Sequence, residues 1–133
     1  MTSEQFHSLL GELARVCGHA DPEAFLVHRQ LCIEGRQVVL EHNPRHGEDL
    51  LQVRMTVGDL PAGAAHLAGA MLDANFMGRG SCVLSLHPDA DVVVATTLLR
   101  LSSTPTAQDL WQELQQMARA CEAFWDSIAT ANA

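Results

Sequence analysis

The sequence contains no lysine, and its 8 basic residues stand against 16 aspartates and glutamates. Charged residues make up only 18% of the chain, and the formal net charge is −8. Phosphate groups bind to clustered positive charge, so this balance disfavours nucleic acids and anionic membrane surfaces as partners. The low charge content also leaves mildly polar or apolar surface, which is typical of proteins that bind other proteins.

Long hydrophobic runs are also missing. No stretch approaches the roughly 20 apolar residues that a membrane helix needs. The opening MTSEQF has neither the basic cluster nor the apolar run of a signal peptide. The four cysteines form no CxxC pair and lie far apart, at Cys17, Cys32, Cys82 and Cys121. We therefore expect a cytoplasmic protein with reduced, buried thiols and no structural disulfide or metal.

The 133 residues predict a single domain over 1–133, and 47% apolar residues suffice for a hydrophobic core. Apolar residues recurring every three or four positions predict three helices, over Thr2–Cys17, Ala62–Phe76 and Ala107–Trp125. Thr2 or Ser3 can cap the first helix, and Thr106 can cap the last.

Alternation of apolar and polar residues predicts five strands, over Phe25–Glu34, Arg36–His42, Leu50–Val57, Ser81–Leu86 and Val92–Leu101. The segment His19–Glu23 is interpreted as a turn, and Glu34-Gly35 as the tight turn of an antiparallel hairpin. The expected fold is therefore an α+β domain with the order α-β-β-β-α-β-β-α. A twisted antiparallel sheet carries the helices on one side.

Catalytic and metal-binding chemistry finds little support in the residue pattern. His42 and His46 lie near Glu48 and Asp49 and could bind a transition metal, but a solvated loop is the favoured interpretation. Cys32 and Cys82 lie in apolar strand patterns, where thiols stay protonated and inert. No serine stands in a G-x-S-x-G elbow. We predict no catalytic residue, metal or cofactor, with a small Cys- or His-dependent enzyme as an alternative.

The first hairpin is apolar on both faces, with Leu26 and Cys32 on one and Val27, Leu31 and Ile33 on the other. Three short helices must cover five strands, so one region of the sheet is expected to stay partly open. Such a surface can accept an extended peptide or an amphipathic helix.

The segment Met71–Leu101, MLDANFMGRGSCVLSLHPDADVVVATTLLRL, resembles the class I type III secretion chaperones, the Tir-chaperone-like family of Gram-negative bacteria. Members of that family show a helix that ends in an "LL-AN" phrase, then a glycine turn, a short "L-L-P" or "L-L-D" strand and a hairpin into a valine-rich strand. The predicted element order and the acidic charge of this chain are similar as well.

This resemblance implies a cytoplasmic bacterial homodimer without enzymatic activity. Such chaperones bind the extended N-terminal segment of a secreted effector and keep it soluble and export-competent. The predicted partner-binding residues are Leu9, Leu13, Phe25, Val27, Leu31, Ile33 and Leu40. The predicted dimer-interface residues, on the second helix and the last two strands, are Leu67, Met71, Phe76, Val83 and Val94. The alternative is a regulator of the anti-activator type that holds a transcription or secretion regulator.

Overall fold

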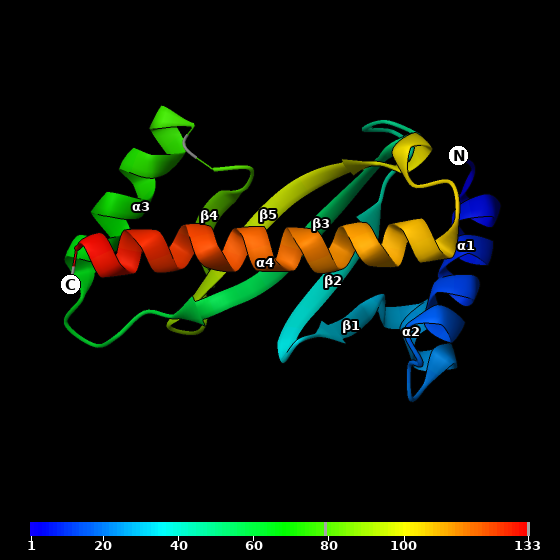
Figure 1. Ribbon diagram of the computed structural model, residues 1–133, viewed down its shortest axis with the longest axis horizontal. Helices are drawn as coiled ribbons and strands as arrows, with labels where there is room; N and C mark the ends of the chain where they lie inside the picture. The colour runs from blue at the N-terminus through cyan, green and yellow to red at the C-terminus, as the bar shows by residue number, and fades with distance from the viewer. Residues whose placement is uncertain (79, 133) are drawn as a thin grey trace.

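The computed structural model describes residues 1–78 and 80–132 and forms one α+β fold (Figure 1). Its five strands make a single antiparallel sheet in the order β1-β2-β3-β5-β4. The predicted order α-β-β-β-α-β-β-α is confirmed, with one additional short helix. The elements are α1 Ser3–Val16, α2 Pro22–His28, β1 Gln30–Ile33, β2 Arg36–His42, β3 Leu50–Asp59, α3 Ala65–Met77, β4 Val83–Leu86, β5 Val92–Arg100, a 3₁₀ turn Leu101–Ser103 and α4 Ala107–Ala131.

The long helix α4 crosses one face of the sheet, with α1 and α2 at one end of the molecule and α3 at the other (Figure 1). Strand residues alternate between this inner face and an outer face. The inner face is buried, and its side chains form the core together with α1 and α4. It comprises Leu31, Ile33, Val38, Leu40, Leu51, Val53, Met55, Val57, Leu84, Val93, Ala95 and Leu99.

Helix α1 begins and ends as its sequence predicts. Thr2 and Gln5 form a reciprocal capping box, with the Gln5 amide donating to the Thr2 hydroxyl at 3.1 Å. The apolar stripe includes Phe6, Leu10 and Leu13, which are buried. Gly18 follows the helix at φ 66°, a left-handed conformation that favours glycine. Local signals are therefore sufficient to define this helix.

The predicted strand over Phe25–Glu34 is wrong in its first half, because that part of the chain forms α2. Asp21 is the N-cap and accepts a hydrogen bond from the Ala24 amide at 3.1 Å, and Pro22 occupies the first turn. An Asp-Pro pair is a strong helix start, since proline is tolerated where its missing N–H would have no partner. Arg29, at φ 57°, ends the helix, and β1 follows.

The predicted turn at Glu34-Gly35 is confirmed, with φ values of 51° and 84°. Two consecutive left-handed residues match the twist of an antiparallel hairpin. Two ion pairs then hold this hairpin to α4. The Arg119 guanidinium donates to the Glu34 carboxylate, with an Nη2–Oε1 distance of 2.6 Å, and Arg36 pairs with Glu122.

For the last helix, the three- and four-residue spacing of apolar residues predicts a buried stripe, and α4 buries a slightly different one. The predicted stripe comprises Leu110, Leu114, Met117, Cys121, Phe124 and Ile128. Leu110, Leu114, Cys121 and Ile128 are buried as expected. Ala118 and Trp125 are also buried, whereas Met117 and Phe124 are only partly covered. The Trp125 indole lies against the backbone of β3 at Gly58, where a Cβ atom would be 2.5 Å from its Nε1. The absence of a side chain at Gly58 therefore allows α4 to pack closely against the sheet.

Helix α3 begins at Ala65 rather than at the predicted Ala62, because Pro61–Ala64 form a turn in which the Ala64 amide donates to the Pro61 carbonyl. It ends at Gly78, which adopts φ 61°. The Asn75 side chain pairs with both backbone polar groups of Leu84, at 2.7 and 2.9 Å. Helix α3 and strand β4 are thus joined into one unit, which we call the α3–β4 wing (residues 65–77 and 83–86).

Replacing Thr106 with alanine should lower the free energy of unfolding by about 1 kcal/mol, because its hydroxyl caps α4 by accepting from the Asp109 amide at 3.1 Å. Urea denaturation at one protein concentration measures this loss. The control is Thr130→Ala on the exposed last turn of the same helix, which should change stability by less than about 0.5 kcal/mol. Equal losses in the two variants would contradict a capping role for Thr106.

Candidate protein-binding surfaces

The outer face of the sheet remains partly exposed along β2, β3, β4 and β5. Its side chains mix small polar and aliphatic groups, namely Gln37, Val39, Glu41, Gln52, Arg54, Thr56, Val83, Ser85, Val94, Thr96 and Leu98. The middle of this face is hollowed by a cavity of about 540 Å³. Gln37, Val39 and Arg54 line it from one side, and Val94 and His87 from the other. A concave, partly apolar sheet face of this kind suits an extended chain.

The α3–β4 wing carries a second exposed surface. Along α3, the exposed positions Ala65, Gly69, Leu72 and Phe76 follow one another at helical spacing. Phe76 is 89% exposed and Leu72 is 62% exposed. We call these four positions the α3 stripe. Met77 at the end of α3 and Val83 on β4 add further exposed apolar area. Neighbouring exposed apolar residues of this kind are typical of surfaces that bind a partner.

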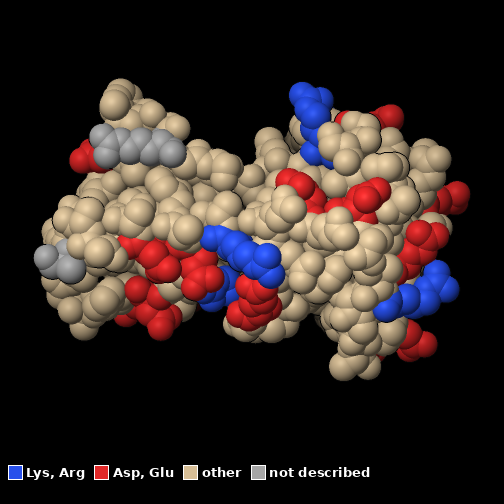
Figure 2. Space-filling view, in the orientation of Figure 1, with Lys and Arg blue, Asp and Glu red and all other residues tan. Residues whose placement is uncertain are grey.

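Helix α3 is therefore apolar on two sides. Leu67, Met71 and Ala74 face the interior and are buried, while the α3 stripe faces solvent. A helix that is apolar all round is normally buried, so one side of α3 lacks its partner in the single chain. Figure 2 shows few Asp, Glu, Lys or Arg side chains over α3, whereas acidic and basic groups gather along α4 and around α1 and α2.

Six of the seven predicted partner-binding residues lie in the core. Leu13 is fully buried, and the exposed fractions of the others reach only 7%. Side chains inside the core cannot touch a partner in this conformation, so the prediction is wrong for Leu9, Leu13, Phe25, Leu31, Ile33 and Leu40. Phe25 instead packs against His19 from within α2, with ring centroids 5.1 Å apart. Val27, on α2, is the exception and is 74% exposed.

The predicted dimer-interface residues divide between core and surface. Leu67 and Met71 are buried within the chain, so their own side chains do not extend to a second copy. Phe76 and Val83 are exposed, and Val94 lies half-buried on the outer face. Sequence reasoning missed the exposed residues Leu72, Met77 and Leu98. The sequence signal that points to an exposed apolar surface on α3 is the near absence of charged residues from this helix, in which Asp73 is the one acidic residue.

The candidate metal ligands around His42 take part in local structure. His42 belongs to β2, is 8% exposed, and its Nε2 pairs with the Glu48 carbonyl at 2.8 Å. The Asp49 carboxylate accepts hydrogen bonds from the Ser102 amide and hydroxyl, which hold the pKa of that carboxyl below its ordinary value. Within residues 1–78 and 80–132, no three His, Cys, Asp or Glu side chains gather as metal ligands.

The cysteines are all free thiols. Cys32 faces the outer side of β1 and is exposed, so the expectation of four buried thiols is wrong for this residue. Cys17 is partly exposed after α1, and burial raises the pKa of its thiol. Cys82 and Cys121 are buried.

No protein-family model matches the chain, and a search of curated proteins finds no match. Among the described helices, none is both long enough and apolar enough to cross a membrane. The surfaces on the α3–β4 wing and on the outer face of the sheet are therefore the observations on which a function can be proposed.

Proposed function

We propose that the chain is a type III secretion chaperone, acting in the bacterial cytoplasm as a homodimer without enzymatic activity. It binds the extended N-terminal segment of a secreted effector and keeps that segment soluble and export-competent. The observation that carries this proposal is the unpartnered α3 stripe beside an open, hollowed sheet face, in the element order that the family resemblance implies.

The α3–β4 wing supplies the dimer contact in this proposal. A two-fold axis beside the α3 stripe would place Leu72 and Phe76 against the same residues of a second copy, covering apolar surface on both. Ala65 and Gly69 have small side chains or none, so the two helices could approach closely at the start of the stripe. Val83 and Met77 would extend the contact along β4 and the end of α3.

The outer face of the sheet supplies the surface for the effector segment. Its central hollow of about 540 Å³ offers apolar contact at Val39 and Val94, with glutamine and arginine side chains around them. The short strand β4 lies at the edge of the sheet and can add main-chain hydrogen bonds to an extended chain. The net charge of −8 favours a segment with basic residues.

Co-expression with the N-terminal segment of the protein encoded by the neighbouring open reading frame tests this function. The segment should co-purify with the chain and should exchange its amide hydrogens rapidly outside the bound stretch, as an unfolded chain does. Capture of a folded regulator in place of a secreted segment would overturn the export function and support the anti-activator alternative.

Two matched variants test whether the effector segment binds at the hollow on the outer face. Val94→Asp places a charge in the hollow and should weaken capture at least about tenfold, or about 1.4 kcal/mol. Gln112→Asp adds the same charge at an exposed position of α4, away from the hollow, and should leave capture unchanged. Isothermal titration with the purified segment measures both, and equal affinities would contradict binding at the outer face.

A further inference from the structure

Strand β4 ends the sheet and carries main-chain groups that point away from its one neighbour, β5. Just past β4, the His87 amide donates to the Val92 carbonyl at 2.9 Å. In an antiparallel pair, positions bonded in this way alternate with positions whose main-chain groups point to the other side. The main-chain groups of Ser85 therefore face β5, whereas those of Leu84 and Leu86 point to the free edge of the sheet. An added strand would pair with these two residues.

The side chain of Asn75 already occupies the main-chain groups of Leu84. Its Nδ2 donates to the Leu84 carbonyl at 2.7 Å, and the Leu84 amide donates to its Oδ1 at 2.9 Å. A residue of a paired strand would offer the same two partners, one N–H and one C=O. Leu84 is only 2% exposed, so leaving both groups unpaired would be costly. The Asn75 carboxamide thus stands where a further strand would pair with β4.

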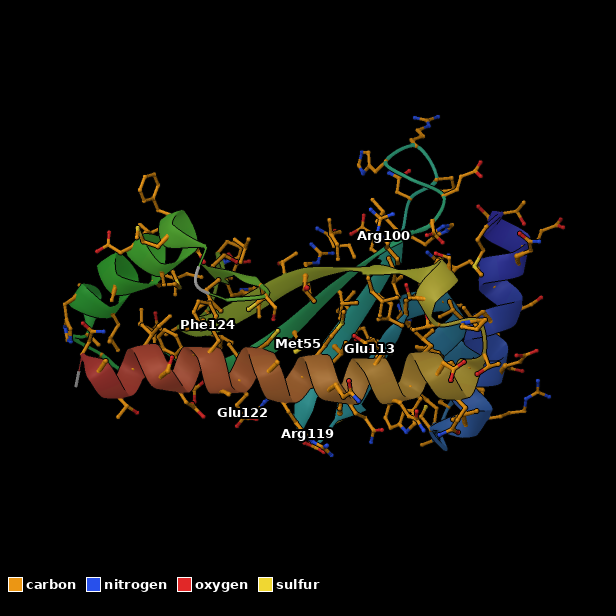
Figure 3. All side chains as sticks on the ribbon, turned by 45° about the horizontal axis from the view of Figure 1, so that its top comes forward. Met55, Arg100, Glu113, Arg119, Glu122 and Phe124 are labelled. Atoms are coloured by element: carbon orange, nitrogen blue, oxygen red, sulfur yellow. The ribbon has the colours of Figure 1, made fainter. Side chains whose placement is uncertain are left out.

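Helix α3, which carries Asn75, is not closely packed on α4 along its whole length. A hollow of about 360 Å³ lies between the two helices, lined by Ala70, Ala74 and Phe124 among others. In Figure 3, Phe124 lies on α4 near its α3 end. Helix α3 ends at Gly78, whose φ of 61° turns the chain away from the helix. The end of α3 therefore has room to shift when the two bonds of Asn75 are released.

We propose that Asn75 is a gate on the β4 edge, which opens when an extended chain takes over its two hydrogen bonds with Leu84. Such a partner is recognised by its main chain, since only an extended backbone offers an N–H and a C=O in this arrangement. Until then, the gate keeps the edge from pairing with strands of other molecules, a general hazard of sheet edges. The identity of the incoming chain, the effector segment, rests on the proposed function, whereas the closure of the edge by Asn75 does not.

Amide hydrogen exchange of the chain alone, followed by NMR, tests the closure. In the wild type the Leu84 amide should exchange slowly although it lies on an edge strand. Asn75→Ala should speed this exchange roughly tenfold or more, while the amides of β5 stay slow and show that the sheet is intact. Asn75→Asp should act in the same direction, because a carboxylate cannot donate to the Leu84 carbonyl.

The matched control for exchange is Asp73→Ala, which removes a polar side chain from an exposed position of the same helix. It should leave the exchange of the Leu84 amide unchanged. If this amide stays slow in Asn75→Ala, the Asn75 side chain does not close the edge and the proposal is overturned.

Isothermal titration with the N-terminal segment encoded by the neighbouring open reading frame tests the opening. Asn75→Ala should bind this segment about tenfold more tightly than the wild type, because no internal hydrogen bonds are given up on binding. A purely structural role for Asn75 predicts equal or weaker binding by the variant, and that result would overturn the gate. Binding by neither chain would contradict the export function instead, and the exchange rate of Leu84 would still decide whether Asn75 closes the edge.

Discussion

Replacing Phe76 with aspartate should weaken the proposed homodimer about 100-fold or more. Phe76 is 89% exposed in the single chain and lies at the end of the α3 stripe. In a two-fold dimer each copy would bury this ring, and removal of a central aromatic from an interface commonly costs 2 kcal/mol or more. Two facing carboxylates would add repulsion between the copies. Sedimentation equilibrium over a range of protein concentrations measures the dissociation constant.

A matched control for this variant lies at the other end of the molecule. Val27 on α2 is 74% exposed, and Figure 1 places α2 and α3 at opposite ends of α4. Val27→Asp makes a comparable apolar-to-acidic change and should leave the dissociation constant unchanged. If Phe76→Asp dimerises as well as the wild type, the α3 stripe is not the interface.

Replacing Gly58 with alanine should cost about 2–3 kcal/mol of folding stability. The added Cβ would lie 2.5 Å from Nε1 and 2.8 Å from Cδ1 of Trp125, a ring that is only 4% exposed. Either α4 or β3 must shift, and overpacking of a filled core destabilises by this amount. Chemical denaturation at a fixed protein concentration measures the loss, which keeps the contribution of dimerisation constant.

Replacing Gly11 with alanine should instead increase folding stability. A Cβ at Gly11 meets nothing within 4 Å and lies in the interior of α1, so alanine should stabilise the fold by about 0.5–1 kcal/mol.

A double variant tests the contact between Gly58 and Trp125. In Gly58→Ala/Trp125→Leu, the combined loss of folding stability should be smaller than the sum of the losses in the two single variants. Additive losses would show that the Gly58–Trp125 contact does not limit the packing of α4.

The fold was largely predictable because its local signals agree with one another. The capping groups at Thr2 and Thr106, the Glu34-Gly35 turn and the alternating strands all produced the expected elements. The segment that begins at Asp21 was not predicted, since its apolar residues fit both a strand period and a helix period over so short a stretch. The Asp-Pro pair at its start favours a helix, whereas the prediction for His19–Glu23 is a turn.

The binding surfaces were harder to predict than the fold. Alternation in a strand identifies two faces but does not tell which face is covered. The sequence therefore predicts Leu31, Ile33 and Leu40 at the partner surface, although they lie in the core. Likewise, the contact of Trp125 with Gly58 joins residues far apart in sequence. Only the packing of α4 across the sheet brings them together.

The mass of the wild-type chain in dilute solution tests the central proposal most directly. At micromolar concentration, a chaperone whose α3 stripe is covered by a second copy should have twice the mass of the 14.4 kDa chain. Sedimentation velocity or mass photometry provides that value without any partner protein. A stable monomer at this concentration would leave Leu72 and Phe76 facing solvent and would contradict the homodimeric chaperone proposed for this protein.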